Sequence, residues 1–212
     1  MDISRMGDLL DYAAAHTSAE PDYLRQIREA TEQAGPGARM VSGHYQGRLL
    51  ALLSKMIRPS VVLETGTFTG YSALCFAEGL VEGGKVITIE RNAALEPVIR
   101  RNLALTPLGS SVDLRIGEAL QVIPGIREIP DLVFLDADKK GYAACYDLLL
   151  PKMRSGGWLL ADNVLWKGKV LDASPDERTR ALMAFSQMVS DDSRVEHLML
   201  PVRDGIHIIR KR

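Results

Sequence analysis

Two groups of acidic and amide residues follow apolar segments in the second half of the sequence. Asp136-Ala137-Asp138-Lys139 comes directly after the run 132–135, and Asp162-Asn163 follows the run 158–161. In parallel α/β sheets, ligands bind beyond the carboxyl ends of the strands, so Asp136, Asp162 and Asn163 can converge if these strands are neighbours. Three oxygen donors without Cys or His suit a hard cation, with Mg²⁺ the first choice and Mn²⁺ or Ca²⁺ the alternatives.

Each of these groups also has a simpler interpretation. A single Asp at a strand end is commonly a helix cap. The Asp-x-Asp pattern also occurs in phosphatases that form an aspartyl phosphate, but their chemistry needs a hydroxyl residue soon after the second Asp, where this chain has Lys139-Lys140. A nearby cation disfavours the ammonium form of Lys139, which suits this residue to act as a general base. The alternative is a solvated lysine like Lys140.

A second group of candidates surrounds the first apolar run of the α/β region. The segment 64–70, Glu-Thr-Gly-Thr-Phe-Thr-Gly, lacks the G-x-G-x-x-G spacing of dinucleotide sites. Its glycines either let a ligand approach the backbone closely or only make a tight turn. Glu90, at the end of the second run, is placed to accept hydrogen bonds from ribose hydroxyls, with a surface charge as the alternative. Two acids and an open loop favour a nucleoside with a cationic or neutral tail, such as S-adenosylmethionine.

The elements that must position these residues alternate along the chain. Three helices are predicted first, at 2–15, 21–34 and 43–57, with Gly35-Pro36-Gly37 ending the second. Strands are then predicted at 61–63, 85–89, 112–116, 131–135 and 158–161, with helices near 70–82, 92–105, 140–150 and 175–189. This alternation predicts an α/β fold with a mostly parallel sheet covered on both faces. Asp204-Gly205 between the extended runs 195–202 and 206–210 predicts an antiparallel hairpin, which favours a methyltransferase sheet over a dinucleotide-binding one.

Composition limits the class of protein. The chain has 212 residues, 46% hydrophobic and 25% charged, so it is expected to fold. Its net charge of −1 weighs against a dedicated nucleic-acid binder and leaves a local basic patch open. We expect one domain over 1–212, with a helical extension at 1–37 and a catalytic core at 38–212. Cys75 and Cys145 sit among apolar or small residues and are expected as buried free thiols. With no signal pattern and no membrane-spanning run, we expect a cytoplasmic protein without membrane contact.

Taken together, these segments resemble one family. The strong ones are 64–74, 134–139 and 162–168, supported by Met40-Val41-Ser42 and by 200–205. The sequence resembles the cation-dependent O-methyltransferases, which include catechol and caffeoyl-coenzyme A O-methyltransferases, from about residue 38 to the C-terminus.

The resemblance implies a Rossmann-like class I methyltransferase fold with a seven-stranded sheet, and often a homodimer with its N-terminal helices near the interface. It implies metal ligation by Asp136, Asp162 and Asn163, with Lys139 as the base. The implied contacts with S-adenosylmethionine are Val41, Glu64, Gly66, Thr67, Ser72, Glu90, Ala119 and the backbone near Asp136. The implied acceptor is a small catechol-like or caffeoyl-like molecule with vicinal hydroxyls. Trp166 is either a wall for this flat acceptor or ordinary packing.

The chain departs from the family in places, and other functions stay open. Glu90 replaces the Asp of many members but keeps the acceptor role, Thr65 stands where many have Ile or Leu, and 1–37 matches no specific pattern. Some bacterial relatives methylate 5-hydroxyuridine in transfer RNA, which is the alternative acceptor. Basic residues that could form a surface for RNA, or merely a solvated one, are Arg100, Arg101, Lys139, Lys140, Lys167, Lys169 and 210–212. A non-catalytic binding protein and an NAD-dependent oxidoreductase are disfavoured.

Overall fold

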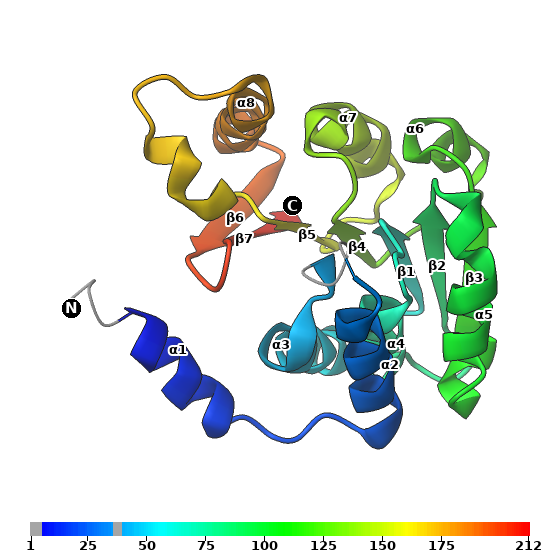
Figure 1. Ribbon diagram of the computed structural model, residues 1–212. Helices are drawn as coiled ribbons and strands as arrows, with labels where there is room; N and C mark the ends of the chain where they lie inside the picture. Colours follow the sequence, from blue (N-terminus) through cyan, green and yellow to red (C-terminus); the bar gives the residue numbers. More distant parts are fainter. Residues whose placement is uncertain (1–5, 36–39) are drawn as a thin grey trace.

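The centre of the molecule is one seven-stranded sheet. The computed structural model describes residues 6–35 and 40–212, and Figure 1 shows the sheet between two layers of helices. The strand order is β3-β2-β1-β4-β5-β7-β6, with the first five strands parallel and β7 antiparallel to both of its neighbours. The strands are β1 Val61–Thr65, β2 Lys85–Glu90, β3 Val112–Ile116, β4 Leu132–Leu135, β5 Trp158–Asp162, β6 Val195–Leu200 and β7 Ile206–Lys211. The predicted fold class and the C-terminal hairpin are confirmed.

Helices cover both faces of the sheet. The α-helices are α1 Met6–Ala15, α2 Asp22–Gln33, α3 Gly43–Ile57, α4 Tyr71–Ala77, α5 Glu96–Leu103, α6 Ala119–Val122, α7 Tyr142–Lys152 and α8 Glu177–Asp191. Short 3₁₀ helices are η3 Ala93–Leu95, η4 Pro107–Ser111, η5 Ile123–Gly125, η6 Lys139–Gly141 and η7 Trp166–Leu171. In Figure 1, α6, α7 and α8 lie on one side of the sheet and α2, α3 and α4 on the other, while α1 extends away from both layers.

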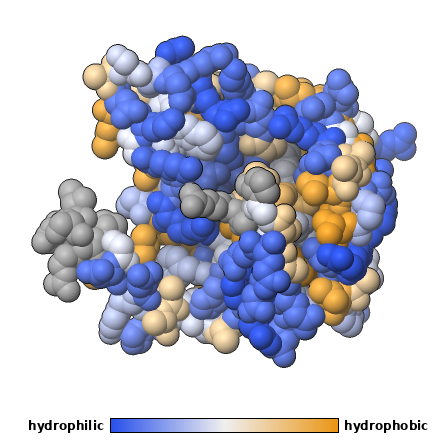
Figure 2. Space-filling model, viewed as in Figure 1, coloured by the Kyte–Doolittle hydropathy of each residue, from blue (hydrophilic) through white to orange (hydrophobic). Residues whose placement is uncertain are grey.

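The two faces of the sheet carry separate cores. On β4, Val133 and Leu135 pack toward α7 and α8, whereas Leu132 and Phe134 pack toward the α2–α5 side. This alternation follows from the two-residue repeat of a strand, and both sets are fully buried because a parallel sheet is covered on both sides. The outer surface seen in Figure 2 is largely hydrophilic, with hydrophobic side chains gathered near α5 and β3.

Several predicted boundaries differ from the structure. The helix expected over 70–82 ends at Ala77, two residues before Gly79, which packs directly on the backbone of Ser54 in α3, where a Cβ would collide. The short helix α6 and the break between η3 and α5 were not predicted. The start of the first predicted helix, and the Pro36-Gly37 part of the second helix's expected stop, lie outside the described residues.

Cys75 and Cys145 are buried free thiols, as predicted. Burial raises the pKa of the Cys145 thiol to about 11, so it stays protonated and unreactive at neutral pH. Within the described part of the chain, no helix has the length and apolar character to cross a bilayer.

Candidate active site

The loop after β1 lies against the ends of two neighbouring strands. Gly66 N–H donates to the Ile89 carbonyl on β2 at 2.9 Å, and the Thr65 carbonyl accepts from Asp136 N–H at 3.0 Å. Gly66 has φ of 93°, and a Cβ there would collide with the backbone carbonyl of Asp136. The position therefore requires glycine both for its backbone conformation and for the close approach of the β4 segment.

Glu64 is a buried carboxylate beneath this loop. Its Oε2 accepts a hydrogen bond from Thr88 Oγ1 at 2.5 Å, while its Oε1 is buried without a protein partner among the described residues. Burial raises the pKa of Glu64 to about 7, although the hydrogen bond from Thr88 opposes this rise. An unpaired buried acceptor at this position can take a donor from a ligand or from a water molecule that bridges to it.

Glu90 connects the loop after β1 to the end of β2. Its carboxylate accepts from Phe68 N–H at 2.9 Å and from Asn92 N–H at 2.8 Å, and only 7% of the residue is exposed. Each oxygen keeps a further lone pair, so both hydroxyls of a ribose can still donate to it. Gly117 N–H donates to the Glu90 carbonyl at 2.9 Å, which brings the segment that leads into Ala119 to the same edge.

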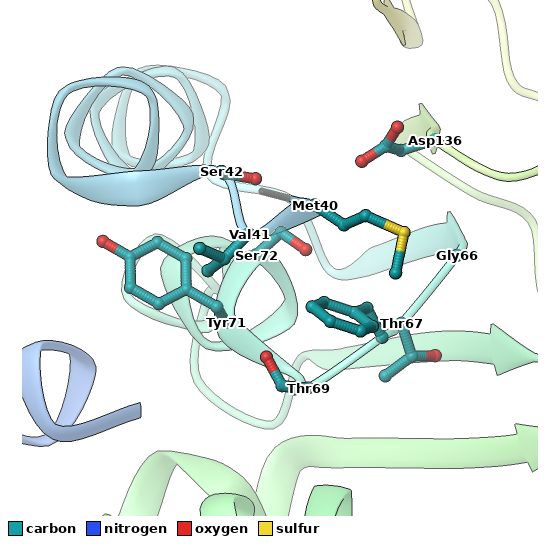
Figure 3. A pocket seen from close by; sticks show the side chains of 10 residues that line it. Met40, Val41, Ser42, Gly66, Thr67, Thr69, Tyr71, Ser72 and Asp136 are labelled. Atoms are coloured by element: carbon teal, nitrogen blue, oxygen red, sulfur yellow. The ribbon is translucent and has the colours of Figure 1, made fainter. Parts of the chain in front are cut away.

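A hollow lies over this loop, and Figure 3 shows the residues around it. The side chains of Met40 and Asp136 project over the segment that carries Gly66, and Ser72 approaches from the start of α4. The lining residues are Met40, Val41, Ser42, Gly66, Thr67, Phe68, Thr69, Tyr71, Ser72 and Asp136. Five of the predicted cofactor contacts, Val41, Gly66, Thr67, Ser72 and Asp136, therefore lie around one hollow, whereas Glu64, Glu90 and Ala119 are not in its lining.

Lys139 lies at the carboxyl end of β4, within the turn η6. Its Nζ donates to Asp136 Oδ1 at 2.7 Å and to Tyr142 Oη at 2.8 Å. The Tyr142 hydroxyl in turn donates toward the carbonyls of Leu135 at 2.7 Å and Asp162 at 3.0 Å. Tyr142 is 1% exposed, so these bonds form away from water and fix the lysine between β4 and β5.

Asp162, the last residue of β5, lies next to this group. Its Oδ2 accepts from Gln46 Nε2 on α3 at 2.6 Å, and its Oδ1 accepts from Asn163 N–H at 2.7 Å. Asn163 follows with φ of 57°, the left-handed conformation that Asn tolerates better than most residues. The structure thus brings Asp136, Lys139 and Asp162 to one edge of the sheet, with Asn163 adjoining in the chain.

The two carboxylates share an unfavourable environment. Burial raises the pKa of Asp136 to about 7, Lys139 opposes this rise, and the charge of Asp162 adds to it. Burial likewise raises the pKa of Asp162, again opposed by Lys139. Within the described residues, no group of three or more His, Cys, Asp or Glu side chains could hold a metal ion. The predicted ligand set contains two carboxylates and one amide.

Sequence reasoning missed two side chains of this site. Gln46 contacts Asp162 across 116 positions of the chain, which no local pattern indicates. Tyr142 does carry a signal, because it stands three residues after Lys139, the spacing at which side chains on a helical turn meet. Trp166 packs against the hydrophobic core under α8, with the Arg178 guanidinium 5.9 Å from its ring centre, in agreement with the packing interpretation.

The reversed strand β7, the glycine loop on β1 and the acid at the end of β2 define a methyltransferase of the S-adenosylmethionine-dependent class. A sequence model of the O-methyltransferase family matches residues 14–212. The chain therefore belongs to the O-methyltransferase family and is an S-adenosylmethionine-dependent enzyme.

Individual relatives agree with this assignment. The mouse catechol O-methyltransferase domain-containing protein 1 is 33% identical over 209 residues, covering 96% of this chain and 79% of its own. The catechol O-methyltransferase of Niastella koreensis is 32% identical, covering 92% and 87%. Among solved structures, SAH-bound PaMTH1 of Podospora anserina has a TM-score of 0.90 and 26% identity, covering 100% and 97%. The O-methyltransferase of Bacillus cereus in complex with SAH has a TM-score of 0.87 and 29% identity, with 97% of each chain covered.

Proposed function

We propose that this enzyme methylates one hydroxyl of a small aromatic acceptor with vicinal hydroxyls, of catechol or caffeoyl type, with the help of a divalent cation. The observation that carries the proposal is the convergence of Asp136, Lys139 and Asp162 beside the hollow over the β1 loop. The relatives named catechol O-methyltransferase and caffeoyl-CoA O-methyltransferase support the same acceptor class.

The donor set fits a hard cation, Mg²⁺ before Mn²⁺ or Ca²⁺. Asp136 and Asp162 are buried carboxylates whose pKa values are raised by burial, so a positive charge between them would favour their ionised forms. Together with the amide of Asn163 they offer only oxygen donors, which Mg²⁺ prefers. When bound there, the cation would lower the pKa of the acceptor hydroxyl, as such ions do for bound water.

The protein's own groups would perform the remaining steps. In its neutral amine form, which a nearby bound cation would favour, Lys139 Nζ, held by Asp136 and Tyr142, would receive the proton from the acceptor hydroxyl. Bound S-adenosylmethionine would supply the methyl group, with an O–C bond formed at the acceptor oxygen as the methyl–sulfur bond breaks and S-adenosylhomocysteine is left as the product. Glu90 would bind the ribose of the cofactor, while the unpaired Oε1 of Glu64 would face the polar methionine part, directly or through water. The β1 loop and the residues Val41, Thr67, Ser72 and Ala119 would hold the cofactor in place, so that much of the rate comes from positioning.

The test is methyl transfer from labelled S-adenosylmethionine to 3,4-dihydroxycinnamate, with Mg²⁺ and with a chelator. We expect the chelator to abolish transfer while calorimetry still detects cofactor binding. Asp162→Ala should lose metal-dependent transfer, and Asp192→Ala, which removes a carboxylate bound to Arg194 far from the site, should retain it. Full metal-dependent activity of Asp162→Ala would contradict the ligand assignment.

Transfer RNA is the alternative acceptor, and the ion pairs of the basic residues count against it. Lys140 pairs with Glu177 at 2.7 Å, and Lys169 pairs with Asp176 at 3.1 Å. The same holds at the C-terminus, where Arg210 pairs with Glu196 at 2.6 Å. These pairs leave less unbalanced positive charge for a phosphate backbone. Transfer to undermodified transfer RNA, without transfer to any small diol, would reverse this preference.

We also propose that the chain forms a homodimer through its N-terminal region and acts in the cytoplasm. The support for the dimer is the presence of exposed apolar residues on α1 and α3, where Tyr12 is 65% exposed and Met56 is 79% exposed. Light scattering after gel filtration measures the mass in solution. A monomer of 23.3 kDa at micromolar concentration would exclude the dimer.

A further inference from the structure

The turn between β6 and β7 forms one wall of the catalytic edge. Val164 N–H donates to the Gly205 carbonyl at 3.2 Å, and Leu165 N–H donates to the Asp204 carbonyl at 2.9 Å. Ile206, the first residue of β7, pairs with Asp162 in the sheet. The turn is therefore fixed against the segment that follows Asp162.

Arg203 is the cation that this turn presents. It is exposed, and its Nη1 lies 3.5 Å from the position that a Cβ on Gly43 would occupy. Gly43 begins α3, the helix whose Gln46 donates to Asp162. The guanidinium thus lies between the start of α3 and the β6–β7 turn. Its charge also acts on Asp136, whose pKa is raised by burial and lowered in part by Lys139 and Arg203.

Three other cations near this edge have partners. Lys139 is bound by Asp136 and Tyr142, and Lys140 pairs with Glu177. Lys169 pairs with Asp176. Arg203 forms no salt bridge with any residue that the structure describes. Its donors are therefore available to a ligand.

We propose that Arg203 is a specificity-determining residue that binds an anionic group, such as a carboxylate, on the acceptor. This inference rests on the proposed function, because it assumes that the vicinal hydroxyls of the acceptor reach Lys139. A guanidinium binds a carboxylate through two parallel hydrogen bonds and discriminates strongly against a neutral group of the same shape. The preferred acceptors are then acidic aromatic diols over their neutral counterparts.

The test compares two acceptors that share the diol ring and differ in charge, 3,4-dihydroxycinnamate and 3,4-dihydroxycinnamyl alcohol. The variant is Arg203→Gly, since φ of 52° at this position suits glycine and the turn should keep its shape. We expect kcat/KM for the acid to fall by about tenfold or more, the loss of a charged hydrogen bond. For the alcohol it should change by less than about twofold. Arg203→Lys should retain part of the preference, and Lys169→Ala, which removes a paired cation, should retain all of it.

Each other outcome overturns the inference. An equal loss with both acceptors would mean that Arg203 acts through Asp136 and Asp162 and not on the acceptor. If the ratio of kcat/KM between the acid and the alcohol is the same in Arg203→Gly and the wild type, Arg203 does not bind the charged group of the acceptor. If the wild-type enzyme binds S-adenosylmethionine but methylates neither diol, the proposed function fails first, and this inference fails with it.

Discussion

The hydroxyl of Tyr142 connects the two strand ends that carry the proposed catalytic groups, so removing one oxygen atom should affect both folding and turnover. Tyr142→Phe deletes the bonds to the Leu135 and Asp162 carbonyls and the acceptor for Lys139 Nζ, at 2.7, 3.0 and 2.8 Å. The ring can stay in place, because Phe185 packs edge-on against it with a centroid distance of 5.5 Å. The variant therefore isolates the role of the oxygen.

The magnitude follows from the number of lost bonds and from their burial. A hydrogen bond contributes about 1 kcal/mol, and a buried group left without its partner costs about 1–3 kcal/mol. We expect the free energy of unfolding of Tyr142→Phe to fall by about 3 kcal/mol in urea titrations. Because Lys139 keeps only Asp136 as a fixed partner, kcat should fall by about tenfold or more, whereas the dissociation constant of S-adenosylmethionine should stay within about twofold.

Tyr146 supplies the matched control on the same helix. Its ring also packs edge-on against Phe185, at 6.0 Å, but its hydroxyl donates to Asp192, away from the site, at 2.9 Å. Tyr146→Phe should lower the free energy of unfolding by about 1.5 kcal/mol, the loss of one hydrogen bond to a carboxylate, and leave kcat unchanged. If Tyr142→Phe turns over like the wild type, Lys139 is positioned without Tyr142. If the two variants lose equal unfolding free energy, the hydrogen bonds of the Tyr142 hydroxyl to β4 and β5 do not contribute the additional stability expected of them.

Three further changes test other parts of the structure. Gly66→Ala should lower the free energy of unfolding by about 2 kcal/mol or more, because backbone strain and a collision with the Asp136 backbone both contribute. Gly83→Ala has similar strain (φ of 73°) but open space around it, so it should cost about 1 kcal/mol. Equal losses of unfolding free energy in urea would show that the structure relieves the collision. Glu90→Gln should weaken S-adenosylmethionine binding about tenfold by calorimetry, since a charged acceptor is lost, and an unchanged affinity would reject the ribose role. Burial lowers the pKa of His207 to about 4 from 6.5, so the unfolded chain binds more protons between these values, and this residue makes stability rise with pH across that window by about 3 kcal/mol. In His207→Leu, the unfolding free energy should therefore differ less between pH 4.5 and pH 7 than in the wild type. The same pH dependence of the unfolding free energy in both proteins would contradict this prediction.

Local sequence patterns predicted most of the sheet. Val62-Leu63 and the run 132–135 are buried on both faces of the sheet, so they appear in the sequence as parts of short, continuous apolar segments, which are typical of a covered parallel strand. The ends of helices were harder to predict from the sequence. Gly79, just after the end of α4, packs on α3, and this contact between segments that are far apart in the chain has no local signal.

The same distinction applies to the site. The acids at the strand ends were predicted because the topology of parallel sheets brings such ends together, whatever the connecting segments contain. Gln46 and Arg203 could not be predicted in this way. Their positions depend on how α3 and the β6–β7 turn pack against β5, and this is determined by tertiary contacts with no local periodicity.

The strand order also separates the enzyme into regions that can vary independently. The groups proposed to hold the cofactor come mostly from the continuous stretch 64–119, on β1, β2 and the turn after β3. Arg203, the residue proposed to select the acceptor, lies near the C-terminus, and its guanidinium lies beside the start of α3, which precedes this stretch. Substitutions in these outer segments can therefore change which acceptor is methylated while the cofactor machinery remains intact. New substrate preferences in such a protein would be expected to arise by mutation near its two ends, with the middle of the sequence held nearly constant.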